Sequence, residues 1–175
     1  IECYELRSQE FGENSVDSQL VEPLKSIGTI FIQQGRFEEA LVCYKRSLEI
    51  EKQCEPPNLA SMADSLNNLG VIYSELNKLE RALRFYKQAL RIQIEILPSN
   101  HLSIAATMSN IGLANKKLRR FDKALRWFTN SLEIREKTLP NDHPDIVGLV
   151  EQMKSMQSPD NNFNYNYNTN TINHE

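Results

Sequence analysis

A repeat of 42 residues is the feature that most constrains how this chain can fold. The same kind of residue recurs at that interval in five columns of the sequence. The columns are Gly28, Gly70 and Gly112; Ala40, Ala82 and Ala124; Tyr44, Tyr86 and Phe128; Leu48, Leu90 and Leu132; and Pro56, Pro98 and Pro140. Because five columns keep one register, chance does not explain them, and the period predicts an array of similar structural units.

Within each unit the apolar residues follow a helical period. In the middle unit Leu66, Leu69 and Tyr73 form one stripe at steps of three and four residues. A second apolar stripe begins near Ala82 and continues to Ile94. Each unit is therefore predicted to consist of two amphipathic helices joined by a tight turn, and the whole array is predicted to be all-α.

Small residues in two columns indicate close packing and tight turns. A glycine inside a helix costs about 1 kcal/mol relative to alanine, so we expect Gly70 to meet Ala82 where the two helices of a hairpin come closest. The turn column holds Gly35, Asn77 and Arg119. Glycine and asparagine tolerate the left-handed conformation there, whereas Arg119 is expected either to be mildly strained or to turn differently.

The columns resemble the tetratricopeptide repeat, whose pattern is W-x-x-L-G-x-x-Y, then A-x-x-x-F, then P. The middle unit matches it with Leu66, Leu69, Gly70, Tyr73, Ala82, Tyr86 and Pro98. The first unit supplies Leu24, Ile27, Gly28, Phe31, Ala40, Tyr44 and Pro56, and the third supplies Met108, Ile111, Gly112, Ala124, Phe128 and Pro140. Asn115 replaces the aromatic residue of the third unit, which predicts looser packing in that hairpin.

The units are about eight residues longer than the usual 34, and we expect the additional residues to lengthen the second helix. Long second helices, the run from Ser131 to Val147 and the LNNLG segment are similar to the kinesin light chain subclass. The resemblance covers roughly residues 1–157. It implies a right-handed α-solenoid that binds other proteins.

The register divides the chain into six predicted segments. Residues 1–17 are the end of a preceding repeat's second helix and a linker, and three repeats occupy residues 18–60, 61–102 and 103–144. Residues 145–157 form a capping helix with Asp142 as its cap. The Asn- and Tyr-rich residues 158–175 form a disordered tail, which is either a plain tail or a self-associating segment. Since the chain begins at Ile1, partway through a unit, we expect it to be a fragment of a longer protein.

The starts of two helices are also predicted. Pro23 lies inside the first helical stretch, so that helix either begins late, near Leu20 to Glu22, or is kinked. Pro98 and Pro140 each end a second helix. His101 and His143 occupy the same repeat position, one repeat apart, in the turn before a helix. This placement favours a turn-and-cap role over joint metal binding.

Composition argues against several classes of function. The formal net charge of −3 does not suit nucleic acid as the main partner. There is no glycine-rich phosphate loop, metalloprotease helix or nucleophile elbow, so we expect no enzymatic activity, no cofactor and no metal. The carboxylates of Glu38, Glu39, Glu49 and Glu51 have helix-surface spacings and are expected to form a solvated face. No apolar run approaches the roughly 20 residues of a membrane span. Three cysteines without a C-x-x-C pair favour a reducing, cytoplasmic compartment.

In a stack of such hairpins the first helices line the concave side, so their outward columns are the candidate binding surface. The candidate partner-binding residues are Lys25 and Thr29; Asn67, Asn68 and Val71; and Ser109, Asn110, Leu113, Lys116 and Lys117. An asparagine amide can pair with the backbone of an extended peptide whatever the sequence of that peptide. By resemblance to kinesin light chains, Asn68 and Asn110 would clamp such a peptide, although they would also suit a solvated helix face.

Charge along the chain suggests the kind of peptide. The third repeat carries a net charge of +4, concentrated between Lys116 and Arg126. This stretch predicts docking of an acidic or phosphorylated segment, or else is a solvated basic turn. We therefore expect a scaffold that binds an extended, acidic peptide in its groove, as a cargo or adaptor module like kinesin light chain. The alternative is an array that localises or regulates a larger protein with a separate enzymatic or signalling domain.

Overall fold

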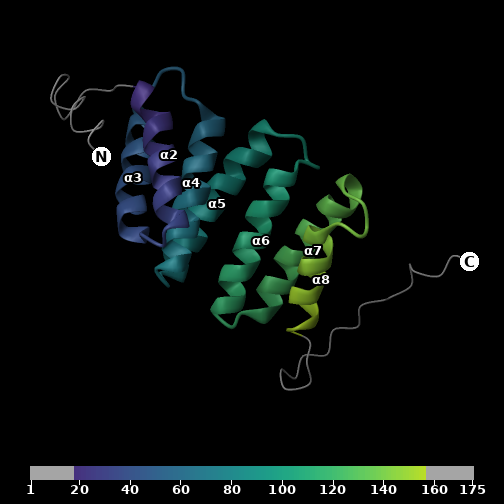
Figure 1. The fold of residues 1–175 in the computed structure, drawn as a ribbon. Helices are drawn as coiled ribbons and strands as arrows, with labels where there is room; N and C mark the ends of the chain where they lie inside the picture. The colour runs from purple at the N-terminus through teal and green to yellow at the C-terminus, as the bar shows by residue number, and fades with distance from the viewer. Residues whose placement is uncertain (1–17, 157–175) are drawn as a thin grey trace, which may run out of the picture.

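The computed structural model describes residues 18–156, which form a short 3-10 helix and seven α-helices (Figure 1). The helices are η1 (Ser18–Leu20), α2 (Val21–Gln33), α3 (Phe37–Gln53), α4 (Leu59–Glu75), α5 (Leu79–Ile96), α6 (Leu102–Lys117), α7 (Phe121–Thr138) and α8 (Pro144–Lys154). They pack as the antiparallel hairpins α2–α3, α4–α5 and α6–α7, with α8 against α7. The predicted all-α stack of helical hairpins is confirmed.

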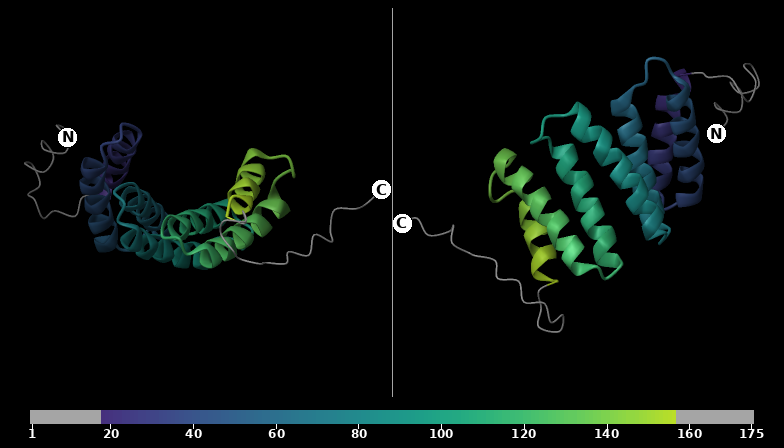
Figure 2. Two further views of the ribbon diagram at one scale, coloured as in Figure 1. Left: turned by 90° about the horizontal axis from the view of Figure 1, so that it is seen from below. Right: turned by 180° about the vertical axis from the view of Figure 1, so that it is seen from behind.

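The stack is curved, and the two sets of helices line opposite sides of it. In the left view of Figure 2, α2, α4, α6 and α8 lie along the inner side of the curve and α3, α5 and α7 along the outer side. The concave side therefore consists of first helices together with the final helix α8. The predicted capping segment and the first helices thus form one continuous surface.

The 42-residue register sets the turns of the hairpins. The helices α3, α5 and α7 begin at Phe37, Leu79 and Phe121, one repeat apart. In each turn a backbone N–H donates to the carbonyl five residues back and closes the end of the first helix, as from Arg36 to the Phe31 carbonyl at 2.8 Å. This bond belongs to the Schellman motif, which requires a left-handed residue just beyond the helix.

All three turn residues adopt that left-handed conformation. The φ angles are 71° at Gly35, 55° at Asn77 and 57° at Arg119. Arg119 therefore turns in the same way as its counterparts, which decides between the two predicted alternatives. Since a residue with a Cβ atom is disfavoured there by roughly 1–2 kcal/mol, the hairpin geometry imposes a local cost on this arginine.

The repeated glycine makes room for an aromatic ring, which corrects the expected contact with Ala82. A Cβ atom built on Gly70 would lie 2.5 Å from the Tyr86 ring. The same construction at Gly28 and Gly112 meets Tyr44 at 2.7 Å and Phe128 at 2.5 Å. The ring of each second helix thus lies against the bare backbone of the first helix, and Ala82 packs elsewhere in the same buried cluster.

Helix starts also follow from single residues. The helix α2 begins late, at Val21, because the Pro23 nitrogen carries no hydrogen to donate one turn back. His101 and His143 are the N-caps of α6 and α8: each Nδ1 accepts a backbone N–H, from Ser103 at 3.1 Å and from Asp145 at 3.2 Å. The predicted cap role of the histidines is confirmed, and the assignment of the α8 cap to Asp142 is wrong.

The additional residues of the long repeat are shared between both helices of a hairpin. The helices α4 and α5 contain 17 and 18 residues, so the expected lengthening of the second helix alone is wrong.

Asn115 is buried and donates from Nδ2 to the Ile111 carbonyl at 2.8 Å. The predictions for residues 1–17 and 158–175, the helix end, the linker and the tail, lie outside the described residues.

Four apolar clusters follow one another along the described stack. The first joins η1 and α2 to Ile50 of α3, the second surrounds Phe31 and Tyr44, the third surrounds Tyr73 and Tyr86, and the last joins Phe128 of α7 to α8. Each of the last three is built by one hairpin with its neighbour, as expected of repeats that cannot bury their faces alone. None of the helices within residues 18–156 is long and apolar enough to cross a membrane.

Candidate peptide-binding groove

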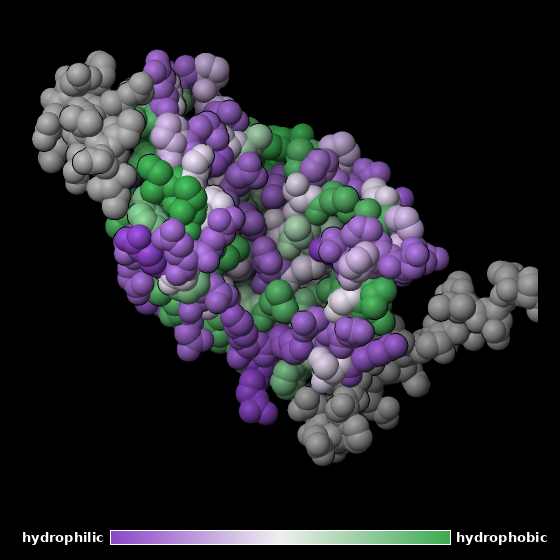
Figure 3. Space-filling view, viewed as in Figure 1, coloured by the Kyte–Doolittle hydropathy of each residue, from purple (hydrophilic) through white to green (hydrophobic). Residues whose placement is uncertain are grey.

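The ten predicted partner-binding residues all lie on the first helices, which line the concave side. Lys25 and Thr29 are on α2, the next three on α4 and the remaining five on α6. All ten are at least partly accessible to solvent. Viewed from the concave side, Figure 3 shows polar residues over the hollowed middle of this face, with pale and apolar residues between them.

The helices α4 and α6 are joined by amide and hydroxyl groups. The Asn67 Oδ1 atom accepts from Asn110 Nδ2 and from Thr107 Oγ1, each at 3.4 Å. Asn68 donates from Nδ2 to the Asp64 carbonyl at 3.1 Å. Its Oδ1 atom has no hydrogen-bond partner among residues 18–156. The structure thus brings Asn67 and Asn110 together and leaves Asn68 with an acceptor that can take a further hydrogen bond.

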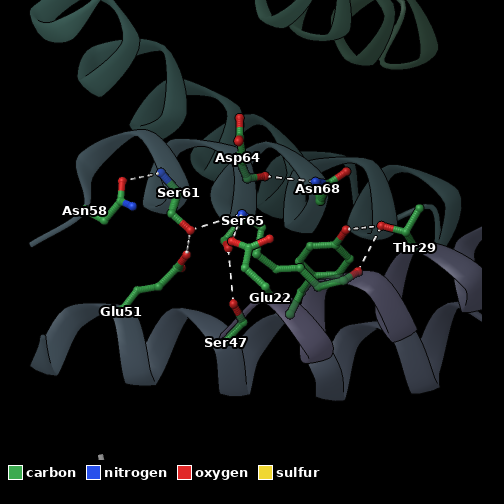
Figure 4. A network of polar contacts seen from close by, with 11 residues as sticks. Glu22, Thr29, Ser47, Glu51, Asn58, Ser61, Asp64, Ser65 and Asn68 are labelled. Atoms are coloured by element: carbon green, nitrogen blue, oxygen red, sulfur yellow. Dashed lines mark hydrogen bonds and ion pairs between the residues drawn. The ribbon is translucent and has the colours of Figure 1, made fainter. Parts of the chain in front are cut away.

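The helices α2 and α4 are joined through a larger polar network. Lys25 donates from Nζ to Ser61 Oγ at 3.0 Å, and Ser61 donates to the Glu51 carboxylate (Figure 4). On the other side of the network Thr29 Oγ1 lies 2.7 Å from the Tyr44 hydroxyl. Lys25 and Thr29 are therefore held in place by contacts within the protein, and within residues 18–156 neither forms a hydrogen bond with an asparagine of α4 or α6.

The two lysines at the end of α6 point to opposite neighbours. Lys116 donates from Nζ to Gln152 Oε1 of α8 at 2.6 Å. Lys117 reaches back to α4, where its Nζ lies 3.5 Å from Glu75 Oε1. Both ammonium groups bridge adjacent helices along the concave side, so this basic site is partly engaged with the protein itself.

The structure contains a column of buried polar residues that was not predicted, and its first member corrects the expectation that Glu51 lies on a solvated helix face. Glu51, Gln93 and Arg135 occupy the same repeat position on the second helices, with 2%, 4% and 9% of their surfaces exposed. They lie where one hairpin meets the next first helix. The signal was present in the sequence, because the three positions are 42 residues apart and change from acidic to neutral to basic.

The first member of this column is incompletely paired. One carboxylate oxygen of Glu51 accepts from Ser61, while Oε2 is buried without a partner among the described residues. The same residue lines a cavity of about 490 Å³ at the ends of α2, α3 and α4, together with Glu22 and Glu55. This end of the array is therefore acidic and polar.

The last member, Arg135, is held among α6, α7 and α8. Its Nη1 atom donates to the Ala105 carbonyl at 3.3 Å, to Ser109 Oγ at 3.0 Å and to Ser131 Oγ. Its Nε atom lies 4.0 Å from an Asp145 carboxylate oxygen. Burial lowers the pKa of Arg135, and the charge of Asp145 opposes that shift.

Curved stacks of short antiparallel hairpins with a groove of first helices define the class of helical-repeat scaffolds. Models of the tetratricopeptide repeat match residues 19–95 and residues 104–145. The chain therefore belongs to the tetratricopeptide-repeat family, and it is a protein-binding module of that family. A comparison with curated protein sequences gave no match.

Solved structures similar to this chain include kinesin light chain-like proteins. A putative kinesin light chain from Podosopora anserina is 20% identical with a TM-score of 0.71, over 82% of this chain and 68% of that one. BtubC (BKLC) from P. vanneervenii is 19% identical with a TM-score of 0.69, over 82% of this chain. The present chain spans 58% of the BtubC chain. These identities establish a shared fold.

A third similar structure contains a bound peptide. It is the first tetratricopeptide domain of Spaghetti (RPAP3) with the HSP90 peptide SRMEEVD. That domain is 18% identical to the present chain with a TM-score of 0.60, and the match covers 81% of this chain and 95% of that one. The sequence of the bound peptide contains two glutamates and an aspartate.

Proposed function

We propose that the concave groove binds an extended, acidic peptide segment of a partner protein, in a cargo or adaptor role like that of kinesin light chains. The observation that carries the proposal is the row of amide side chains across α4 and α6. Asn68 offers an acceptor without a partner among the described residues, and Asn67 and Asn110 are joined by a long 3.4 Å contact. A peptide backbone can replace such a weak contact with shorter hydrogen bonds of its own.

The charge of the groove supports the acidic character of the ligand. Lys116 and Lys117 lie along the concave side at the end of α6 and bind exposed neighbours there. An exposed ion pair such as Lys117–Glu75 contributes little to stability, at most about 1 kcal/mol, so a carboxylate of a ligand can compete with Glu75. The ligand in the Spaghetti structure has acidic residues, which agrees with this chemistry in a related fold.

The reducing, cytoplasmic location belongs to the same proposal. Cys43 is buried and Cys54 is half-buried, and both are free thiols. Burial raises the pKa of the Cys43 thiol, so less of it is in the reactive thiolate form. An unpaired, protected thiol suits a protein that works in a reducing compartment.

A peptide-array screen with the full chain tests the groove. The double variants Asn68→Ala/Asn110→Ala and Lys116→Glu/Lys117→Glu are compared with the unaltered protein. We expect the asparagine variant to weaken binding of all peptides and the lysine variant to weaken acidic peptides selectively. A matched control is Lys45→Glu/Lys52→Glu, which changes the same charge on α3, outside the concave side. Binding that is unaffected by the groove changes would refute the proposal and would direct attention to the convex side.

A further inference from the structure

A cavity on the concave side lies where α6, α7 and α8 meet. Its volume is about 270 Å³. Its lining includes Ser109 and Leu113 of α6, Arg135 of α7, and Asp145, Gly148 and Gln152 of α8. It therefore continues the groove beyond α6 and has a charged residue of the second helix in its wall.

The charge of Arg135 is poorly balanced by the protein. The three acceptors of its Nη1 atom are a carbonyl and two hydroxyls, all neutral. The nearest carboxylate oxygen, of Asp145, is at 4.0 Å, and 59% of the Asp145 side chain is exposed to solvent. A buried charge is costly unless it is closely paired. The Nη2 atom of Arg135 has no hydrogen-bond acceptor among the described residues. The guanidinium therefore has capacity for a closer anion.

The equivalent positions at the other two junctions along the groove, between α2 and α4 and between α4 and α6, do not offer the same chemistry. Between α4 and α6 the equivalent residue is Gln93, and the contacts of Asn67 with Thr107 and Asn110 span the groove. Between α2 and α4 the equivalent residue is Glu51, whose charge repels anions. Among the described repeats, only the junction of α6, α7 and α8 has a cation at this position of the second helix. The Lys25 side chain, between α2 and α4, is 14% exposed and already donates to Ser61 beside Glu51.

The cavity is open because α8 has a glycine on its groove side. A Cβ atom built on Gly148 would meet nothing within 4 Å, unlike the three helical glycines that face aromatic rings. Lys116 extends over the rim, where it donates to Gln152 and to Ser155 Oγ at 3.0 Å. The cavity thus combines free space, a buried guanidinium and a rim ammonium with one exposed carboxylate, of Asp145.

We infer that this cavity accepts a carboxylate of the peptide bound in the groove and so fixes the position of one acidic group on the ligand. The inference rests on the proposed function and extends it. Arg135 would donate to the carboxylate in the geometry that guanidinium groups favour. The ligand would lie with its acidic group at the α8 end of the groove, away from the acidic end around Glu51.

Pools of acetylated, amidated nonapeptides test the inference. Each pool has glutamate or glutamine fixed at one position and the other positions randomised, and a further pool has a free C-terminal carboxylate and no acidic side chain. The full 175-residue chain is titrated with each pool by fluorescence anisotropy. We expect one glutamate position, or the free C-terminus, to bind about tenfold more tightly than its neutral counterpart.

Two variants remove the site in different ways. Arg135→Gln installs the residue that the middle repeat uses at the same position, and Gly148→Leu fills the cavity without altering charge. Both should reduce the tenfold preference to about one, while Lys123→Gln, an equal loss of charge at an exposed position of α7, should retain it. Circular dichroism establishes that each variant is folded, and Gly148→Leu keeps the test available if Arg135→Gln unfolds.

Each other outcome has a definite meaning. A preference for acidic pools that persists in both Arg135→Gln and Gly148→Leu overturns the cavity as its source. Binding by the unaltered chain without any preference for carboxylates also overturns the inference, but leaves the groove as a peptide site. No binding of any pool refutes the proposed function, and the inference with it. The amidated and free-carboxyl pools distinguish a side-chain carboxylate from a chain terminus.

Discussion

The same substitution, glycine to alanine, is expected to have opposite effects at two helical positions of this protein. At Gly70 the added methyl group would lie 2.5 Å from the Tyr86 ring, which is shorter than any real contact of a Cβ atom. The ring is 3% exposed and is enclosed in the cluster of Tyr73, Leu83 and Leu90, so it cannot swing aside. At Gly148 the methyl group would meet nothing within 4 Å.

The magnitudes follow from two terms. Alanine favours a helix over glycine by about 1 kcal/mol at either position. Overpacking a buried site costs about 1–3 kcal/mol, and the short distance at Gly70 places this site near the upper limit. We therefore expect Gly70→Ala to lower the free energy of unfolding by about 1–2 kcal/mol and Gly148→Ala to raise it by about 1 kcal/mol.

Urea unfolding followed by circular dichroism measures both changes. A change of 1 kcal/mol corresponds to a Tm shift of about 2–4 °C for a chain of this size, so thermal melts provide a second measurement. In a Tyr86→Leu background, where the ring is absent, the penalty of Gly70→Ala should shrink. If Gly70→Ala stabilises the protein as much as Gly148→Ala, the ring does not require the glycine and the reasoning is refuted.

Four further results are expected. Arg119→Gly should raise the urea midpoint, by roughly 0.5–1 kcal/mol in stability, because it relieves a left-handed arginine at φ 57°; an unchanged or lower midpoint would contradict this. Burial raises the pKa of the Tyr86 hydroxyl above its ordinary value of 10.0. The stability that this group contributes is therefore present below pH 10 and is lost at higher pH, by about 1.4 kcal/mol per pH unit. Tyr86→Phe should reduce that loss in alkaline unfolding, and an identical alkaline profile would count against the burial argument. His143→Ala should destabilise α8 by about 1 kcal/mol and His143→Asn should not, as seen in hydrogen exchange of α8, because asparagine restores a cap acceptor; equal effects would exclude the cap. Cys43 should react with iodoacetamide far more slowly in the folded protein than in urea, since its thiol is buried with a raised pKa; similar rates would show that the site is open.

The sequence predicts the repeat architecture well, because its signals are periodic and local. The spacing of apolar residues fixes the hairpins, and the turn column fixes where each first helix ends, as at Asn77. The cap role of His101 follows from its position in the turn. Each of these features depends on a few neighbouring residues, so the chain itself specifies them before any long-range contact forms.

Contacts between helices were harder to predict. The partner of Gly70 is the Tyr86 ring and not Ala82, because side-chain direction as well as spacing decides which groups meet. The column of Glu51, Gln93 and Arg135 was overlooked since its members differ in charge, although their register is the same. Polar residues at a hidden junction have no apolar period to reveal them, and their role depends on the distance between neighbouring hairpins.

The polar bridges between adjacent repeats also have a mechanical meaning. Lys117 with Glu75, Arg120 with Glu80 and Asn110 with Asn67 each connect residues of adjacent repeats. In an array where each repeat contacts its neighbours, each bridge restrains one junction between repeats, and the junctions follow one another along the stack. Two of the three are exposed ion pairs that salt weakens. Small angular changes at each junction would add along the series, so the span between the two ends of the groove should lengthen or shorten with ionic strength.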